Sequence, residues 1–250
     1  MPGTVACVWL GQAGYLFKSP EGAIIAVDPY LSDYAEQQWG MPRAIPSAID
    51  MTEIRPDLLL CSHWHEDHLD QPVIRHWAGR EPGVFIGPGD SYFRALAWGW
   101  PKDNAVRLDR GEIVTFKDVT ITATFARHEA LAPDAIGFLM DFGGLKIWDV
   151  ADTEYDARLR PMRTERIDVA MIPINGVGGN LNVYEAALLL WHVQPTIAIP
   201  MHYNMWEPAV FGEGATLDPG EFVSFYNKLG GGESQIMTVG EIATFTKIPR

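Results

Sequence analysis

The run His63-Trp64-His65-Glu66-Asp67-His68 constrains this chain more than any other feature of its sequence. It follows a stretch of three leucines that is typical of a buried strand. Side chains two positions apart in an extended chain point the same way, so His63 and His65 can reach one cation. Asp67 and His68 follow on a tight turn, where they can supply a second. Since these donors would be costly to bury unpaired, the run predicts a metal site.

The composition restricts the class of molecule that such a site can bind. Only seven of the 250 residues are histidine, so three within six positions is a marked concentration. Acidic residues outnumber basic ones 32 to 19, which gives a formal net charge of −13. A field of this sign repels polyanions and no basic cluster offsets it, so we expect no nucleic acid partner. A small-molecule substrate is the expected partner instead.

The first residues and the apolar runs of the chain indicate in which cellular compartment we expect the protein. The first residues, Met1-Pro2-Gly3-Thr4, lack the charged and apolar regions of a signal peptide. No apolar run approaches the roughly 20 residues that span a bilayer. We therefore expect a cytoplasmic protein without a membrane partner. Assembly into a homo-oligomer is compatible with the sequence.

The two cysteines, Cys7 and Cys61, do not suggest a disulfide framework. Both fall in strand-like runs, where a buried thiol is the ordinary interpretation. Cys61 also lies two residues before His63, and in a strand those side chains share a face. A cysteine metal ligand therefore remains open at this position.

The chain reads as one α/β domain over 1–250, because many strands are interleaved with helices and no linker separates two halves. Expected helices are Gln71–Ala78, Ser91–Trp98, Thr153–Leu159, Ala186–Val193 and Phe222–Leu229. Asn182 and Asp218 are the expected N-caps of the last two. The strand-like runs are Val5–Leu10, Tyr15–Lys18, Ala23–Val27, Leu58–Ser62, Val84–Gly87, Ile113–Phe116, Thr120–Ala126, Gly137–Phe142, Leu145–Val150, Val169–Ile174, Ile197–Pro200 and Ile242–Phe245.

The histidine-rich run resembles the metal-binding motif of the metallo-β-lactamase superfamily. Members carry three further ligands in a fixed order, and this chain offers His128 and Asp152 at two later strand ends and His202 beyond the last buried strand. Each is weak alone, since His128 could be a surface residue and Asp149 could replace Asp152. All elements occur in the superfamily's order, and the chain is therefore identified as a member.

This resemblance implies a four-layer αβ/βα sandwich with the metals at one edge, between two sheets. It also implies two divalent metal ions, Zn²⁺ or Mn²⁺ with Fe²⁺ less favoured, which would generate a nucleophile from water. By resemblance the first metal is held by His63, His65 and His128, the second by Asp67, His68 and His202, and Asp152 bridges them. Asp67 and Asp152 are the residues expected to take part in catalysis.

A closer resemblance, to the branch that contains L-ascorbate-6-phosphate lactonase, rests on the segments Leu10–Gly14, Phe85–Pro88, Gly99–Pro101 and Ile199–Tyr203. It implies hydrolysis of a small cyclic ester such as a sugar lactone. The chain departs from that lactonase by carrying a plain histidine, His128, at the third ligand position, which argues against a phosphorylated ascorbate substrate. Cleavage of a phosphodiester at the same two metals is the alternative.

Candidate substrate contacts lie beside the ligands: Trp64, Glu66, Asn180, Tyr203 and Trp206. Trp64 and Glu66 alternate with ligands, so they could face the pocket or pack behind it. The motifs are flanked mostly by acids and aromatics, which favours a neutral substrate over a phosphodiester. Di-iron relatives that perform redox chemistry carry glutamate where this chain has His65, and they have a flavin domain. A non-catalytic role is disfavoured because every ligand type is retained.

Overall fold

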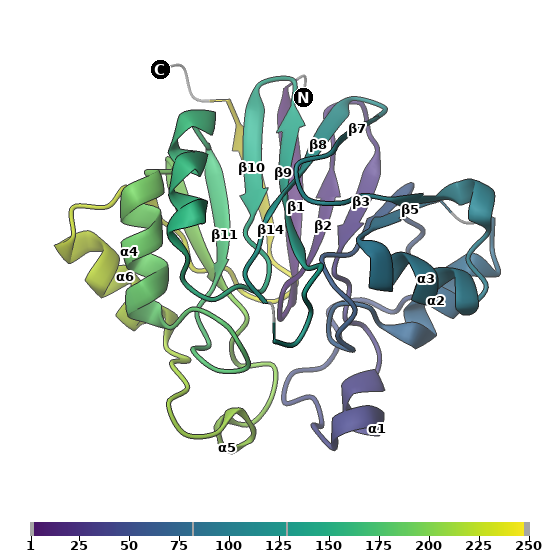
Figure 1. The fold of residues 1–250 in the computed structure, drawn as a ribbon, viewed down its shortest axis with the longest axis horizontal. Helices are drawn as coiled ribbons and strands as arrows, with labels where there is room; N and C mark the ends of the chain where they lie inside the picture. The colour runs from purple at the N-terminus through teal and green to yellow at the C-terminus, as the bar shows by residue number, and fades with distance from the viewer. Residues whose placement is uncertain (1–2, 82, 129, 248–250) are drawn as a thin grey trace.

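The computed structural model describes residues 3–81, 83–128 and 130–247. Within them, two seven-stranded sheets face each other and helices cover their outer sides, as Figure 1 shows. This is the αβ/βα sandwich that the sequence predicts. In order across the first sheet lie β14 (Ile242–Thr246), β1 (Thr4–Gly11), β2 (Gly14–Lys18), β3 (Ile24–Val27), β4 (Leu58–Leu60), β5 (Val84–Gly87) and β6 (Ala105–Arg107).

The second sheet repeats the plan of the first. Its order is β13 (Glu233–Ser234), β12 (Ile197–Met201), β11 (Val169–Pro173), β10 (Leu145–Asp149), β9 (Ile136–Phe142), β8 (Val119–Phe125) and β7 (Ile113–Phe116). In the first sheet the strands from β14 to β3 pair antiparallel, and those from β3 to β6 pair parallel. In the second sheet the strands from β7 to β10 pair antiparallel, and those from β10 to β13 pair parallel. Parallel strands end at the same sheet edge, so the loops that follow them gather there.

The core explains why these runs are strands. β4 and β11 are buried at every position, as expected for strands covered on both faces. β1 instead alternates between buried and half-buried residues at its start, because one face of it is less covered. Between the sheets, the rings of Phe17 and Phe142 lie 6.3 Å apart. The main apolar cluster therefore joins both halves of the chain into one core.

The helices take the two outer layers. On the side of the first sheet lie α2 (Gln71–Ala78) and α3 (Gly89–Ala97), and on the side of the second lie α4 (Val183–Val193) and α6 (Pro219–Lys228). Asn182 forms a complete capping box on α4, and the Asp218 side chain accepts a hydrogen bond from the Gly220 amide, as the sequence predicts. No helix in the described part of the chain is long and apolar enough to cross a membrane.

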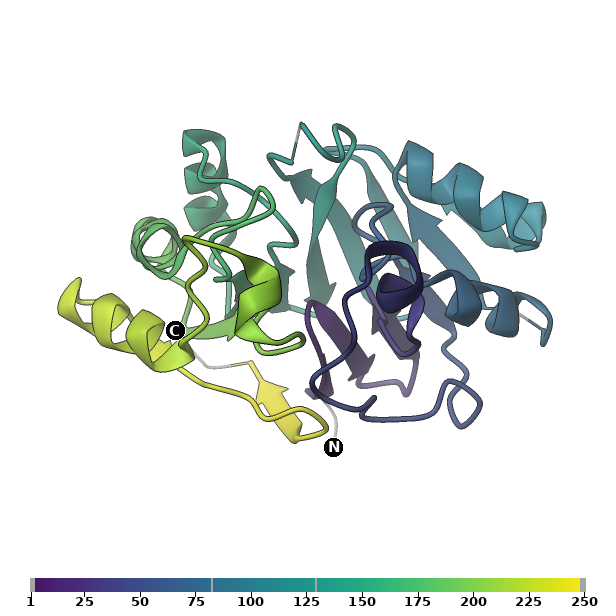
Figure 2. The same ribbon diagram turned by 90° about the horizontal axis from the view of Figure 1, so that it is seen from below.

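Two short helices were not predicted, and one predicted helix is wrong. α1 (Tyr34–Trp39) and α5 (Pro208–Phe211) lie beyond one edge of the sandwich in Figure 1, and they face the viewer in Figure 2. The helix expected over Thr153–Leu159 is instead a 3-10 helix over Ala157–Glu165. Its start is displaced because the Thr153 hydroxyl accepts a hydrogen bond from the Arg127 amide and the Thr153 amide donates to Asn180.

Candidate metal centre

The predicted ligands gather where parallel strands of both sheets end. The histidine-rich run follows β4 and turns back on itself, with the amides of His68 and Leu69 both donating to the carbonyl oxygen of His65. His128, after β8, comes from the second sheet, as do Asp152 after β10 and His202 after β12. Neither sheet alone carries the complete set, so the centre exists only where the two halves of the chain meet.

The first cluster consists of His63, His65 and His128. Nε2 of His63 lies 2.9 Å from Nδ1 of His65, and Nε2 of His128 lies 3.3 Å from that same atom. Two ligands of a tetrahedral zinc ion with bonds of about 2.0–2.1 Å lie roughly 3.3 Å apart, so these two separations are close to those of a zinc site. The pKa of His65 is lowered to about 4, chiefly by burial and also by His128. The imidazole of His65 is therefore neutral at pH 7, which is the form that binds a metal.

The second cluster consists of Asp67, His68 and His202. Oδ2 of Asp67 lies 3.7 Å from Nε2 of His68 and 3.4 Å from Nε2 of His202. Burial disfavours the protonated form of His202, but the carboxylates of Asp152 and Asp67 outweigh this effect and raise the pKa of His202 to about 9. The pKa of Asp67 is lowered to about 2, because the charges of His68 and His202 outweigh burial. Without a metal, the bound protons supply the positive charge that the carboxylates require.

Asp152 lies between the clusters. Its Oδ2 is 3.3 Å from Nε2 of His68 and 4.0 Å from Nε2 of His63, and its Oδ1 is 3.3 Å from Nε2 of His202. One carboxylate therefore faces ligands of both clusters. Burial opposes its negative charge, but His202 and His68 hold its pKa well below the usual range. An anion in this position is suited to bridging two cations.

Two buried polar atoms test whether a metal fits. Nε2 of His68 and Oδ1 of Asp152 are buried, and neither forms a hydrogen bond of normal geometry with any described residue. A buried polar atom without a hydrogen bond costs about 1–3 kcal/mol, which the charged neighbours at 3.3 Å offset only in part. A divalent cation at each cluster would satisfy both atoms. The donor set, imidazole nitrogens and carboxylate oxygens, suits Zn²⁺ or Mn²⁺.

An outer ring of residues orients the histidines, and the sequence analysis missed it. Nδ1 of His68 lies 2.8 Å from the Asp28 carboxylate, and Nδ1 of His128 lies 3.1 Å from the carbonyl oxygen of Gly179. Nδ1 of His63 lies 2.9 Å from the Ser62 hydroxyl. Such partners fix the tautomer and the direction of a ligating ring. Asp28 follows β3 directly, and that position at a strand end is the signal that could have indicated it.

Gln12 is a further residue that the sequence analysis did not assign to the centre. Its side-chain amide donates to Oδ2 of Asp67 at 2.8 Å and lies 3.2 Å from Nε2 of His202. It belongs to the segment Leu10–Gly14, which supplied part of the closer resemblance. Gln12 is fully buried. It therefore positions two ligands of the second cluster from the side of the first sheet.

Two alternatives that the sequence left open do not reach the clusters. Asp149 accepts a hydrogen bond from the Ala151 amide at 2.9 Å, and burial together with the charge of Asp28 raises its pKa well above the usual value. The thiol of Cys61 donates to the carbonyl oxygen of His63 at 3.0 Å and lies 3.6 Å from the Ser91 hydroxyl. Both cysteines are buried and free, as predicted.

A pocket of about 480 Å³ opens onto the clusters. Of the five predicted substrate contacts, Asn180 and Trp206 line it, whereas Trp64, Glu66 and Tyr203 do not. Trp64 lies instead under the guanidinium of Arg94, which is 4.3 Å from its ring, and Tyr203 packs against Trp9 with ring centroids 5.1 Å apart. These three residues therefore lie outside the lining of this pocket. The alternation that aims His63 and His65 inward turns the residues between and after them away.

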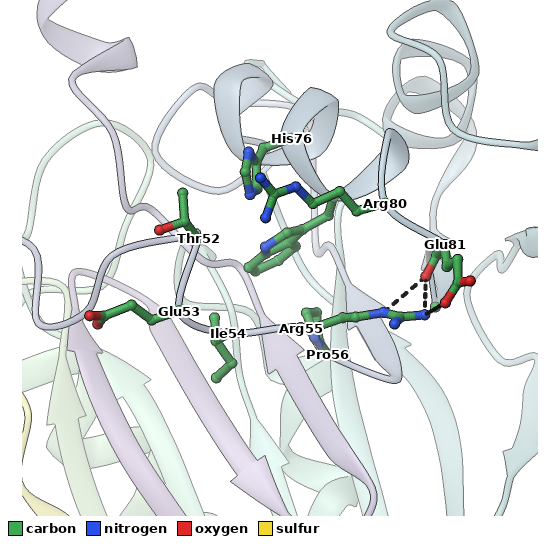
Figure 3. A pocket seen from close by; sticks show the side chains of 10 residues that line it. Thr52, Glu53, Ile54, Arg55, Pro56, His76, Arg80 and Glu81 are labelled. Carbon is green, nitrogen blue, oxygen red and sulfur yellow. Dashed lines mark hydrogen bonds and ion pairs between the residues drawn. The ribbon is translucent and has the colours of Figure 1, made fainter.

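A second cavity, of about 400 Å³, lies beside α2 and is drawn in Figure 3. Arg55 on its rim is paired with Glu81 at 3.1 Å, and His76 and Arg80 come from α2 and from just after it. None of its lining residues belongs to a group of described side chains that could hold a metal. The chemistry suggested by the sequence therefore belongs to the other pocket.

Comparison with known proteins agrees with this geometry. Residues 7–202 match the family described as the Beta-lactamase superfamily domain. The chain belongs to the metallo-β-lactamase superfamily. It is similar to a UPF0173 metal-dependent hydrolase of Polynucleobacter asymbioticus, with 30% identity over 81% of this chain and 75% of that protein. A UPF0173 metal-dependent hydrolase of Anaeromyxobacter is 27% identical over 89% of this chain and 88% of that protein. These relatives place the chain among UPF0173 proteins and not specifically with ascorbate-6-phosphate lactonase.

Solved structures share the fold over almost the whole chain. Igni18, a metallo hydrolase from Ignicoccus hospitalis, superimposes with a TM-score of 0.77 at 21% identity and covers 98% of this chain and 100% of its own. The metallo-β-lactamase fold protein YhfI from Bacillus subtilis gives a TM-score of 0.72 at 16% identity, over 97% and 100% of the two chains. At these identities the likeness concerns the fold.

Proposed function

We propose that this protein is a metal-dependent hydrolase that opens a small cyclic ester at a centre of two divalent cations. The observation that supports this most is the convergence of seven donor residues, six of them buried and His65 half-buried, in two clusters joined by Asp152 beside a pocket. When bound, the cations would lower the pKa of a water molecule and polarise the carbonyl group of the ester. The names of the UPF0173 relatives, metal-dependent hydrolases, support the same reaction class.

The chain's own groups have definable parts in this reaction. Water adds to the carbonyl carbon, the ring C–O bond breaks, and the leaving alkoxide takes up a proton, which gives a hydroxy acid. Asp67 lines the pocket and is anionic, so it can orient the water and accept its proton. Gln12 holds the carboxylate of Asp67 in place through a hydrogen bond of 2.8 Å. Asp67 would combine this role with metal binding.

Asn180 is placed to bind the substrate. Its side-chain oxygen accepts a hydrogen bond from the Thr153 amide at 3.0 Å, one residue after Asp152. This contact fixes the orientation of the amide group, and no described residue accepts a hydrogen bond from its Nδ2. Because Asn180 lines the pocket, its NH₂ group can donate to an oxygen of the ester. We infer that it stabilises the negative charge that develops on that oxygen.

The alternative, phosphodiester cleavage, would use the same clusters. A phosphodiester keeps a negative charge, which normally calls for arginine or lysine in the binding site. In the described part of the chain, no lysine or arginine lines the pocket. This supports an uncharged substrate.

The test is hydrolysis of a lactone panel and of bis-p-nitrophenyl phosphate by protein reconstituted separately with Zn²⁺ and with Mn²⁺. Asp152→Asn serves as the control for contaminating activity. We expect turnover of at least one lactone and a loss of more than about 100-fold in the variant, because removing a ligand disrupts the centre. Turnover of the phosphodiester alone would reject the ester and keep the metal chemistry.

A further inference from the structure

The pocket beyond the metal ligands is walled by apolar side chains. Trp39 comes from α1 and Phe211 from α5, the two short helices that lie beyond the same edge of the sandwich (Figures 1 and 2). Trp206 joins them, with its ring centroid 6.1 Å from that of Trp39 and 5.5 Å from that of Phe211. We define the apolar wall as Trp39, Met41, Leu131, Trp206, Val210 and Phe211.

This wall begins directly at the metal centre. The ring of Trp39 meets the ring of His65 edge to face, with centroids 6.3 Å apart. Trp39 is 38% exposed, although tryptophan is a costly side chain to leave in water. Behind it, Tyr30, Ala35 and Met205 are buried and support the wall. A bound molecule whose ester reaches the clusters would therefore lay its remaining atoms on aromatic and aliphatic carbon.

The polar groups of the pocket are few. Apart from the metal ligands, the polar atoms of its described lining side chains are those of Asn175 and Asn180 and the indole nitrogens of Trp39 and Trp206. Each asparagine already uses one of its two polar atoms, because the Asn175 amide donates to the carbonyl oxygen of Val177 at 3.2 Å and the oxygen of Asn180 accepts from Thr153. Oδ1 of Asn175 and Nε1 of Trp206 are buried and form no hydrogen bond of normal geometry with a described residue, which leaves one acceptor and one donor for a bound molecule. A sugar lactone would bury several hydroxyl groups against this surface. Hydroxyls without partners weaken binding.

Cations near the pocket are engaged elsewhere. Arg43 stacks on the ring of Tyr30 at 4.5 Å and donates to its carbonyl oxygen, and Arg94 stacks on Trp64. Arg127 pairs with Glu154 at 3.2 Å. A phosphate or carboxylate group on the substrate would therefore find only the metals as cationic partners, and the ester must bind there. This disfavours a charged substrate.

We propose that the substrate is an uncharged lactone with an aliphatic or aromatic substituent that lies on the apolar wall, in place of the hydroxyls of a sugar. That the lactone ring is opened is taken from the proposed function. That the substrate carries an apolar substituent is inferred from the apolar wall alone. Trp39 and Phe211 are thereby assigned as residues that determine specificity.

The first experiment compares three lactones with the metal-loaded protein: γ-butyrolactone, γ-nonalactone with its five-carbon tail, and gluconolactone. Each buried methylene is worth about fourfold in binding, so even partial burial of the tail should raise kcat/KM at least tenfold over γ-butyrolactone. Gluconolactone should be the poorest of the three. If gluconolactone is preferred, or if the tail has no effect, the inference is wrong while the proposed function stands.

Matched variants assign the effect to the wall. Trp39→Ala and Phe211→Ala should each reduce the nonalactone-to-butyrolactone ratio of kcat/KM by about fivefold or more, mainly through KM, because the lost ring area no longer covers the tail. Phe93→Ala is the control, since Phe93 is 59% exposed on α3 and lies outside the pocket. An unchanged ratio in both wall variants would contradict the assignment.

A binding measurement keeps the inference testable if no lactone is hydrolysed. Cyclopentanone and 2-pentylcyclopentanone differ only by the tail, and calorimetry can measure both with the metal-loaded protein. We expect the tailed ketone to bind at least tenfold more tightly, and Trp39→Ala to remove most of that gain. Tail-dependent binding without hydrolysis would reject the proposed reaction and retain the apolar site. Equal binding of the two ketones would reject the apolar site.

Discussion

Two carboxyl groups at the end of β10 differ sharply although they are three residues apart. Asp149 is fully buried beside the negative charge of Asp28, and these two causes raise its pKa well above the usual value. Asp152 is also buried, yet the positive charges of His202 and His68 hold its pKa well below the usual range. The surroundings therefore favour the protonated form of Asp149 and the ionised form of Asp152. The surroundings, more than the residue type, separate a structural carboxyl group from a metal ligand.

Asp149→Asn should leave the protein at least as stable as wild type at pH 7. An acid whose pKa is raised in the folded state contributes stability below the unfolded pKa of about 3.9 and loses it as pH rises toward the folded pKa. Asparagine imitates the protonated form and removes this loss. Thermal unfolding between pH 4 and pH 8 should show a flatter decline of Tm in the variant. A marked drop of Tm at pH 7 would mean that Asp149 is ionised.

Asp28→Asn should weaken metal binding without removing any ligand. The carboxylate orients His68 through a contact of 2.8 Å, and loss of such an outer partner typically costs about 10–100-fold in metal affinity. A zinc titration against a chromogenic chelator measures this. Asp57→Asn is the matched control, because Asp57 accepts from the Ile24 amide and pairs with Lys117, with no contact to a ligand histidine. Wild-type affinity in Asp28→Asn would show that His68 needs no orienting group.

At the scale of elements, the loop between β11 and α4 positions the first cluster. Gly179 in this loop has a φ of +78°, and its carbonyl oxygen lies 3.1 Å from Nδ1 of His128. A Cβ atom at this position would lie 2.9 Å from that same nitrogen. The loop therefore combines a backbone conformation that favours glycine with a close approach that excludes a side chain. The position of His128 depends on both.

Gly179→Ala should displace His128 and weaken binding of the first metal about tenfold or more, since an outer contact and a ligand are both disturbed. Gly178→Ala is a close control: Gly178 has a φ of +65°, but an added Cβ would meet no atom within 4 Å. Both variants carry the same kind of backbone strain. If they bind metal equally weakly, strain in the loop and not contact with the ligand would be the cause.

The helices and strands also show which parts of the fold can be predicted from the sequence. Long apolar strands and helices with strong caps, such as the one that Asn182 opens, were predicted because their signals are local. α1 and α5 have six and four residues, too short for a periodic pattern, and their burial against Trp206 depends on contacts from distant parts of the chain. Asp28 and Gln12 are separated by 40 and 55 positions from the ligands they touch. Contacts between residues so far apart in the chain cannot be predicted from the local patterns of a single sequence.

At the scale of the whole molecule, metal binding and protonation are linked. The first cluster contains His65, which is neutral at pH 7 because its pKa is lowered to about 4. In the second, the pKa of His202 is raised to about 9 and that of His68 well above its usual value, by the carboxylates around them. A metal entering the second cluster must therefore displace protons, whereas His65 in the first cluster has no proton to give up at pH 7.

Affinity for the second metal should therefore rise with pH from 6 toward about 9, by up to tenfold per pH unit for each proton released, while affinity for the first stays nearly constant over the same range. Calorimetry in buffers of different ionisation enthalpy counts the protons. Metal-loaded protein should also unfold at a higher Tm than protein treated with chelator, because the complete ligand set is assembled only in the folded state. Equal pH dependence for both metals would contradict the assignment of protonation states.

The division of the ligands between the two sheets has a consequence for the order of events in folding. His63, His65, Asp67 and His68 are supplied by the first sheet, whereas His128, Asp152 and His202 are supplied by the second. A complete coordination shell therefore cannot form until the two sheets have docked. Loading with metal thus reports that both halves of the described chain have reached their native arrangement.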